Sequence, residues 1–231
     1  NVYPVLTTDI AYWTTRGFAV ADVNYRGSTG FGRAYRDALL GRWGELDALD
    51  TIAVARALAA NDVVDGDRMA IRGGSAGGYT TLAVLTTPDH PFACGTSFFG
   101  VADLELLSQH THKFESRYLD RVVGPLPESK DLYRERSPVH RAELLSRPIL
   151  LLQGLEDAVV PPAQAEAMVR AATEQGVPHA YVTFEGEQHG FRRAENIVTW
   201  LETELAFYGQ VMGFTPHGDL PTVDLSAPPA A

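Results

Sequence analysis

The sequence is poor in cysteine, in long hydrophobic runs and in basic residues. Its only cysteine, Cys94, has no partner for an internal disulfide or a zinc site and lies in an apolar stretch, so we expect a buried structural thiol. This sparing use of cysteine is consistent with a cytoplasmic protein. No window approaches the roughly eighteen apolar residues that a membrane span needs, and residues 1–8 lack the basic and apolar regions of a signal peptide. We therefore expect no membrane partner.

The charge of the chain also excludes some functions. The 19 lysines and arginines are scattered among 29 acidic residues, which gives a formal net charge of −10. Because phosphate binding requires clustered basic side chains, we expect no nucleic-acid partner. No residues have the spacing of metal ligands, so we predict neither a metal nor another cofactor. With 231 residues, 45% of them hydrophobic, the chain can bury one substantial core, and we expect one folded domain.

Apolar runs of strand length alternate with longer stretches of helical period. This alternation predicts an α/β fold in which helices cover both faces of a mostly parallel sheet. The expected strands are 18–24, 68–72, 94–99, 149–153 and 180–184, and the expected helices are 8–16, 45–61, 77–86, 161–175 and 193–208.

Two segments depart from the alternation. Residues 101–148 are rich in His, Lys, Arg and Pro, which predicts an excursion of short helices over one sheet edge, a common way to shape a substrate pocket. From residue 209 the sequence loses its periodicity and gains Pro and Gly. We therefore expect a folded unit at 1–208 followed by a loosely held tail at 209–231.

The segment from Gly73 to Gly77 has the pattern Gly-x-Ser-x-Gly between an expected strand and an expected helix. This pattern is typical of a nucleophilic serine, here Ser75, on a strained turn whose neighbours must be small. The N–H of Ala76 would then stabilise an oxyanion at the start of the helix. The alternative is a glycine-rich turn without catalysis, such as a phosphate loop, but no Lys-Ser or Lys-Thr follows the glycines.

A base and an acid are expected at the same rim, because the carboxyl ends of parallel strands meet there. His189 follows the last expected strand, and Asp157 follows the strand before it, in the chain order Ser, Asp, His of hydrolases. Asp103 and Glu156 remain alternative acids, and Asp157 could instead cap a helix. The other histidines lie on the opposite rim, before the acid or in the tail: His179, His90, His110, His112, His140 and His217.

Several further segments carry specific patterns: NYRGSTGFG at 24–32, WGELD at 43–47, GGSAGGY at 73–79 and RSPV at 136–139. Together with the segments around Asp157 and His189, they resemble the prolyl oligopeptidase family of serine peptidases, over about residues 1–208. That family includes dipeptidyl peptidases and acylaminoacyl peptidases. The resemblance implies the α/β-hydrolase fold, and it assigns nucleophile, acid and base to Ser75, Asp157 and His189, as the rim argument does.

The resemblance also implies features that this sequence does not contain. Family members carry an N-terminal β-propeller that restricts access to the site, and a loop before the first helix supplies a second oxyanion donor. This chain begins after that loop, so we expect it to be a piece of a longer protein that also contains the first strands and the propeller. Because a propeller excludes folded proteins, the implied substrate is a short peptide.

The resemblance bears on specificity as well. Acylaminoacyl peptidases often place an Arg two residues after the catalytic Asp, and here that position is Val159, which favours free amino termini. By the same resemblance Tyr79, Val101 and Leu104 would line the pocket for the residue before the scissile bond, although each could equally be core.

Three functions remain open on these grounds. The first is hydrolysis of short peptides, the second is carboxylesterase or lipase action with the same residues, and the third is a noncatalytic interaction domain. The sequence does not decide the residue preferred at the scissile bond, exo- against endo-cleavage, or monomer against homo-oligomer.

Overall fold

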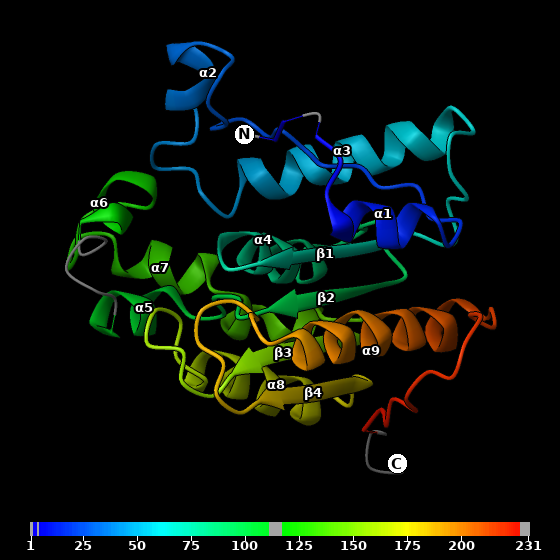
Figure 1. The fold of residues 1–231 in the computed structure, drawn as a ribbon. Helices are drawn as coiled ribbons and strands as arrows, with labels where there is room; N and C mark the ends of the chain where they lie inside the picture. The colour runs from blue at the N-terminus through cyan, green and yellow to red at the C-terminus, as the bar shows by residue number, and fades with distance from the viewer. Residues whose placement is uncertain (1, 4, 111–116, 227–231) are drawn as a thin grey trace.

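Four parallel strands form the sheet in this computed structural model, which describes residues 2, 3, 5–110 and 117–226. They are β1 (Ala70–Gly74), β2 (Cys94–Phe98), β3 (Ile149–Gly154) and β4 (His179–Phe184), hydrogen-bonded in the order β1-β2-β3-β4 (Figure 1). Each matches an expected strand to within two residues. Because all four run in the same direction, their carboxyl ends lie along one edge of the sheet.

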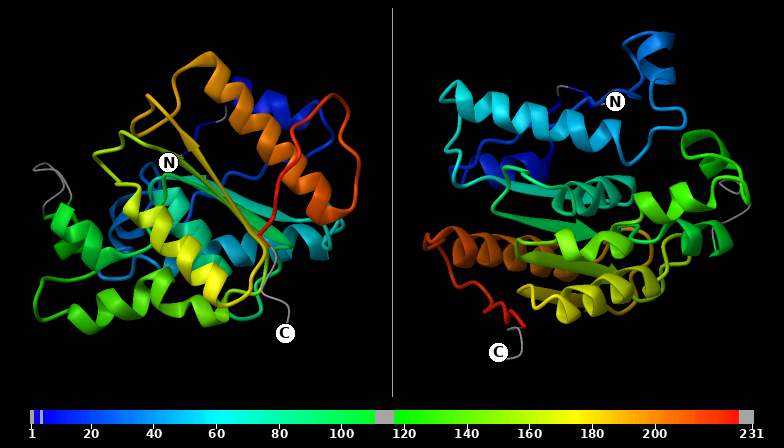
Figure 2. Two further views of the ribbon diagram at one scale, coloured as in Figure 1. Left: turned by 90° about the horizontal axis from the view of Figure 1, so that it is seen from below. Right: turned by 180° about the vertical axis from the view of Figure 1, so that it is seen from behind.

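Helices cover both faces of this sheet (Figures 1 and 2). One face carries α3, α4 and α8, and the other carries α1 and α9. None of the helices in the described part of the chain is both long and apolar enough to cross a membrane. The helix bounds are α1 Thr8–Thr14, α2 Arg33–Asp37, α3 Leu46–Ala60, α4 Ala76–Leu85, α5 Leu104–His110, α6 Tyr118–Val122, α7 Lys130–Arg136, the 3₁₀ helix η1 Pro138–Leu144, α8 Ala163–Glu174 and α9 Ala194–Met212.

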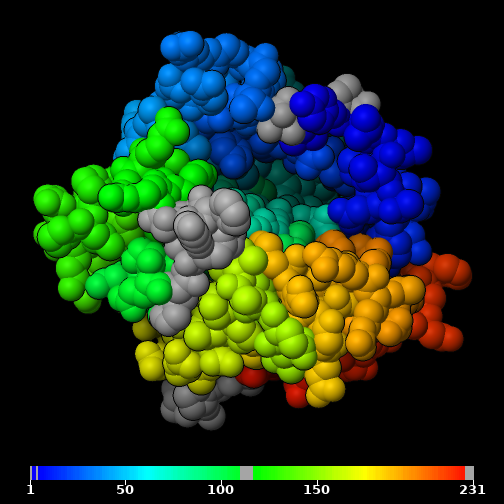
Figure 3. All heavy atoms as spheres, turned by 60° about the vertical axis from the view of Figure 1, so that its left-hand side comes forward, coloured from blue at the N-terminus to red at the C-terminus, as the bar shows by residue number. Residues whose placement is uncertain are grey.

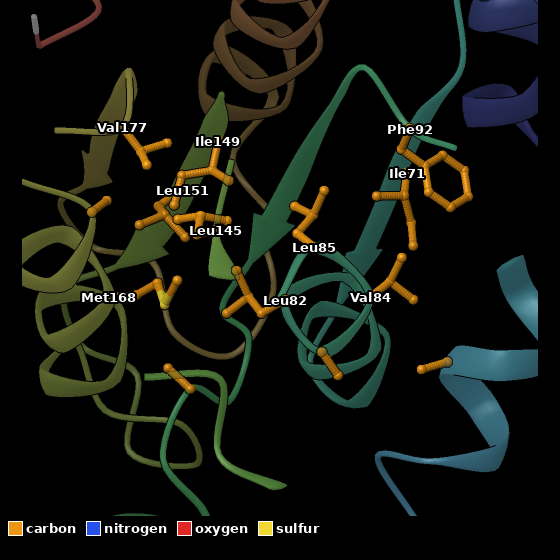
Figure 4. Close-up of a cluster of buried hydrophobic side chains, with 14 of the residues drawn as sticks. Ile71, Leu82, Val84, Leu85, Phe92, Leu145, Ile149, Leu151, Met168 and Val177 are labelled. Atoms are coloured by element: carbon orange, nitrogen blue, oxygen red, sulfur yellow. The ribbon is translucent and has the colours of Figure 1, made fainter. Parts of the chain in front are cut away.

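The core explains why β3 reads as a continuous apolar run. Ile149 and Leu151 point to the face covered by α4 and α8, where Figure 4 shows them among other apolar side chains. Leu150 and Leu152 point to the opposite face and pack against residues of α9. All six residues of the strand are buried. A strand covered on both faces has no solvent-facing position, so the alternation of polar and apolar residues is lost.

A buried ion pair lies on the face covered by α9. Glu204 of α9 has no exposed surface, and its two carboxylate oxygens accept hydrogen bonds from Arg72 of β1 at 2.8 and 2.9 Å. The same carboxylate accepts hydrogen bonds from the Trp200 indole at 3.1 Å and the Tyr208 hydroxyl at 2.7 Å. This network fastens the last helix to the first strand of the sheet.

The strand expected at residues 18–24 is not part of the sheet. These residues are neither helix nor strand, and no strand of the described chain pairs with them. Val20, Asp22 and Arg72 of β1 are among the residues that line a hollow of about 220 Å³. A segment becomes a strand only where a neighbour completes its hydrogen bonds, and no backbone hydrogen bond joins residues 18–24 to β1 in the described chain.

The tail also differs from the expectation. Helix α9 continues to Met212 and ends at Gly213, whose φ of 72° is the left-handed value that favours glycine at a helix end. Beyond it Val223 is buried against the α9 core, and the Ser226 N–H donates to the His179 carbonyl at 2.9 Å. Apolar residues spaced along this segment therefore hold 213–226 against the fold, while 227–231 lie outside the described residues.

The excursion at 101–148 consists of short helices, as expected. Helices α5, α6, α7 and η1 follow one another beyond the end of β2 (Figure 1). Apolar side chains of α5, α6 and α7 form a cluster with Trp43 and Tyr79, separate from the two clusters on the sheet faces. Val139 of η1 instead packs against the cluster that contains α4 and α8. Residues 111–116 of this excursion lie outside the described residues.

Candidate active site

Ser75 occupies a strained turn between β1 and α4. Its φ of 54° and ψ of −120° lie in a region that residues other than glycine rarely adopt, and its N–H donates to the Phe98 carbonyl at 3.1 Å. A Cβ on Gly73 would lie 2.4 Å from the backbone of Gly77, so glycine is required at 73. A Cβ on Gly77 would meet nothing within 4 Å, so the expected requirement for a small side chain applies only to the first of the two.

The two remaining glycines of the turn make room for the neighbouring strand. A Cβ on Gly74 would lie 2.4 Å from the Phe98 ring, and a Cβ on Gly78 would lie 2.7 Å from the Cα of Gly100. No real structure tolerates such approaches to backbone or packed rings. These glycines therefore let β1 and α4 pack closely against β2, which fixes the height at which Ser75 stands above the sheet.

His189 connects Ser75 to Asp157. Its Nε2 lies 2.8 Å from the Ser75 Oγ, and its Nδ1 lies 2.8 Å from the Asp157 Oδ2. An ionised carboxylate can only accept, so Nδ1 donates and Nε2 is free to accept the serine proton. The Asp157 side chain is fully buried and the His189 side chain is 23% exposed. The structure thus brings together three predicted side chains from the ends of β1, β3 and β4.

The Asp157 carboxylate is held from both sides. Its Oδ1 accepts hydrogen bonds from the backbone N–H groups of Val159 at 2.8 Å and Val160 at 2.9 Å, which leaves Oδ2 directed at His189. The helix-cap alternative does not hold, because the residue preceding α8 is Pro162. Because two short hydrogen bonds hold Oδ1, the carboxylate keeps one orientation and does not rotate.

The alternative acids lie elsewhere. Asp103 caps α5 by accepting from the N–H groups of Glu105 and Leu106, and its Oδ2 lies 3.8 Å from Nε2 of His140. Glu156 is exposed. Among the other histidines, His179 is the first residue of β4 and therefore lies at the opposite rim, where its Nδ1 bonds to the Val177 carbonyl.

Glu187 anchors the loop that carries His189, a role that the sequence did not reveal. It is 1% exposed and accepts hydrogen bonds from Arg192 N at 3.0 Å, Arg193 N at 2.9 Å and Asn196 Nδ2 at 2.9 Å. Burial raises the pKa of this carboxyl, but these hydrogen bonds outweigh it and hold the pKa below its usual range. The glutamate two residues before His189 in the sequence was the available signal.

Phe99 lies against the imidazole. Its ring centroid is 4.9 Å from that of His189 and 5.3 Å from that of Phe191, with both pairs edge to face. Its φ of 40° is uncommon for a bulky residue. The aromatic contact limits the room in which the His189 ring can turn.

Comparison with known proteins shows the family to which this chain belongs. The family model described as "Prolyl oligopeptidase family" matches residues 4–215. The chain belongs to the prolyl oligopeptidase family. It is 34% identical over 203 residues to dipeptidyl aminopeptidase BIII of Pseudoxanthomonas mexicana, a match that covers 86% of this chain and 30% of the relative. It is 32% identical to dipeptidyl peptidase family member 6 of Caenorhabditis elegans, over 80% of this chain and 26% of that protein.

Solved structures give the same result. A puromycin-hydrolyzing peptidase of Mycobacterium tuberculosis superimposes with a TM-score of 0.95 at 51% identity, over 98% of this chain and 34% of the other. An acylaminoacyl peptidase of Pyrococcus horikoshii has a TM-score of 0.76 at 25% identity, over 85% of this chain and 33% of the other. The fold is the α/β-hydrolase fold of this family. The chain spans about a third of the length of the relatives that it matches.

Three residues expected in a substrate pocket lie in the core of this family member. Tyr79, Val101 and Leu104 are 0, 3 and 0% exposed, and the Tyr79 hydroxyl donates to the Arg136 carbonyl at 3.0 Å. Their burial corresponds to the core alternative that the sequence left open. Val159, the fourth, is half-buried beside the acid.

The surface over the site is hollowed. Figure 3 views the molecule toward the carboxyl ends of the strands and shows a depression over α4 and β1 (teal), between the N-terminal residues (blue) and the later ones (yellow and orange). Ala76 is the first residue of α4, so its N–H has no acceptor within the helix. Within the described residues, no group of three or more His, Cys, Asp or Glu side chains is arranged to hold a metal ion.

Proposed function

We propose that this chain is the catalytic domain of a serine peptidase, with Ser75 as nucleophile, His189 as general base and Asp157 as the orienting acid. The observation that carries the proposal is the pair of 2.8 Å hydrogen bonds that His189 makes to the other two. An activated serine needs this arrangement, in which the base contacts the nucleophile and a third group fixes the base.

The proposed reaction passes through an acyl-enzyme. The Ser75 Oγ attacks the scissile carbonyl while its proton moves to Nε2 of His189, and Asp157 stabilises the imidazolium without taking the proton. The Ala76 N–H is placed to donate to the oxyanion. Nε2 then returns the proton to the departing amine. In the second half of the reaction Nε2 takes a proton from water, which attacks the acyl-enzyme carbonyl; the ester bond to Ser75 breaks, Nε2 returns the proton to Oγ, and the carboxylic acid product leaves.

We propose short peptides with free amino termini as substrates. Two relatives are named as dipeptidyl peptidases and one as puromycin-hydrolyzing, and puromycin is itself an aminoacyl amide with a free amino group. Val159, in place of a basic residue, supports the same choice. Pocket roles for Tyr79, Val101 and Leu104 would require an opening of the core.

The remainder of the active enzyme is proposed to lie in another segment of a longer protein. A second oxyanion donor and a propeller that restricts access are expected there, since the chain spans 26–34% of the length of the relatives named above. A cytoplasmic location stays a prediction, and so does the choice between a monomer and a homo-oligomer.

Labelling by a fluorophosphonate tests the proposed chemistry, because only an activated serine displaces fluoride from phosphorus. The full-length protein should be labelled, Ser75→Ala should not, and His189→Ala should lose several orders of magnitude in rate. His140→Ala is the matched control. His140 belongs to a second His–Asp pair of the described residues, with Asp103 at 3.8 Å, and the variant should label normally. Labelling that persists in Ser75→Ala would refute the assignment.

Substrate comparison separates peptidase from esterase action. The catalytic efficiency, kcat/KM, is measured for aminoacyl arylamides, for puromycin and for acyl esters of matched size. A peptidase must protonate a poor leaving amine, so it should retain substantial amide turnover. Turnover of esters alone would favour the carboxylesterase alternative, and an unlabelled protein would favour a noncatalytic domain.

A further inference from the structure

Gln153 is an unexpected residue in β3. The strand otherwise consists of apolar residues and a glycine, lies between β2 and β4 (Figure 1), and is buried throughout. The Gln153 side chain has no exposed surface, so its amide is removed from water completely. Such a group weakens a fold unless every polar atom finds a partner.

The amide nitrogen of Gln153 connects the two ends of the loop that carries the acid. Nε2 lies 3.1 Å from the Gly154 carbonyl and 3.1 Å from the Val160 carbonyl. It also lies 3.4 Å from Oδ2 of Asp157, the oxygen that accepts from His189. The two N–H groups of the amide therefore reach the carbonyls of Gly154 and Val160, at the two ends of the loop. The carboxylate of Asp157, between these ends, is a more distant third acceptor.

The carbonyl oxygen of the Gln153 amide makes no hydrogen bond in the described part of the fold. Oε1 of Gln153 is buried and has no hydrogen-bond donor among the described residues. Gln164, the other fully buried glutamine of the described chain, differs in this respect. Its Oε1 accepts from the N–H groups of Ala102 and Asp103, and its Nε2 donates to the Asp103 carbonyl. Gln164 is thus satisfied at both ends, as expected of a residue that serves stability.

We propose that Gln153 is a positioning residue, which holds the loop of residues 154–160 so that Asp157 presents Oδ2 to His189. A hydrophobic residue of the same volume would suit this strand better. The unpartnered oxygen indicates that the amide is present for its donor half, and the donor half contacts only the acid and the ends of its loop. This inference rests on the proposed function of Asp157 and His189.

The test is the rate of fluorophosphonate labelling of the full-length protein as a function of reagent concentration. Gln153→Met keeps the side-chain volume and removes the donor. The maximal labelling rate should fall about 10- to 100-fold, because a shift of about an ångström in a catalytic group has that effect. The half-saturating reagent concentration should change by less than about twofold, since binding at Ser75 is untouched.

Gln164→Met is the matched control. It also removes a buried amide that bonds to a loop, so it should lower the melting temperature while the maximal labelling rate stays within about twofold of wild type. An unchanged rate in Gln153→Met, or an equal fall in Gln164→Met, overturns the inference. If Gln153→Met does not fold, Gln153→Glu replaces it, since it keeps the shape and donates at most one proton. A wild-type rate in Gln153→Glu would then overturn the inference, whereas an unlabelled wild-type protein would refute the proposed function instead.

Discussion

Replacement of Glu187 should destabilise the protein measurably, because three hydrogen bonds to one buried carboxylate would be lost. Hydrogen bonds to charged groups contribute about 1.5–3 kcal/mol each. Arg192 and Arg193 are exposed and Asn196 is half-buried, so water can replace part of what the carboxylate provides. If the two bonds from the backbone N–H groups of Arg192 and Arg193 are each counted at the lower limit, Glu187→Ala should lower the free energy of unfolding by about 3 kcal/mol. Glu187→Gln, which keeps one neutral acceptor, should lose about 2 kcal/mol.

The pH dependence separates the charge from the shape of Glu187. Its pKa in the folded protein lies below the usual value near 4.5, so the stability it contributes is complete above that value. As the pH falls through the lowered pKa, the folded protein must take up a proton at this site and the contribution disappears. The gap between wild type and Glu187→Gln should therefore shrink from pH 7 toward pH 3.5.

Urea unfolding followed by circular dichroism measures both effects through the midpoint and the slope. Glu185→Gln is the control, since Glu185 lies two residues earlier in the same loop and is exposed. It should stay within about 0.5 kcal/mol of wild type. A Glu187→Gln variant that matches this control at pH 7, or a gap that widens on acidification, would show that the carboxylate does not anchor the loop.

Two further outcomes follow from other buried charges. Glu204→Gln should lower the free energy of unfolding, measured with urea, by about 3 kcal/mol. Among the described residues Arg72 would then keep only Asp9, at 2.9 Å, as a carboxylate partner. A loss below about 1 kcal/mol would contradict this. Burial raises the pKa of the Asp47 carboxyl above its usual value near 3.8. The folded protein therefore binds a proton at Asp47 more tightly than the unfolded chain does, and it loses stability as the pH rises through the raised pKa. Asp47→Asn should flatten this part of the melting temperature profile, and identical profiles would refute it.

The parallel direction of the strands and the grouping of the candidate site residues were predictable, because both depend on local patterns and on direction. Parallel strands place their carboxyl ends on one edge, so Ser75, Asp157 and His189 had to meet there if all three strands were parallel. The excluded histidine, His179, lies at the opposite rim for the same reason. No packing detail entered this prediction, and none was needed.

Other features depend on neighbours that a sequence does not name. Residues 18–24 have the composition of a strand, but a strand needs a partner at hydrogen-bonding distance, and no backbone hydrogen bond joins them to β1 in the described chain. Val101 and Leu104 suit a pocket wall and a core equally well, and only the packing around them decides. The tail from 213 to 226 is held by Val223 and by the bond from Ser226, which its Pro and Gly content concealed.

Backbone strain at the site shows where glycine patterns reveal geometry and where they do not. The glycines around Ser75 predict a strained turn, because close backbone approach needs them. The same approach forces strain on the adjacent strand end, where Gly78 and Gly100 nearly touch and Phe99 adopts a positive φ. The Phe99 N–H donates to the Leu152 carbonyl at 2.7 Å, which holds that conformation in place. The glycines therefore show that two segments of the backbone meet. They do not show which neighbouring residue adopts the unfavourable backbone angle. That residue is Phe99, beside His189, and the packing of β2 between β1 and β3 determines it.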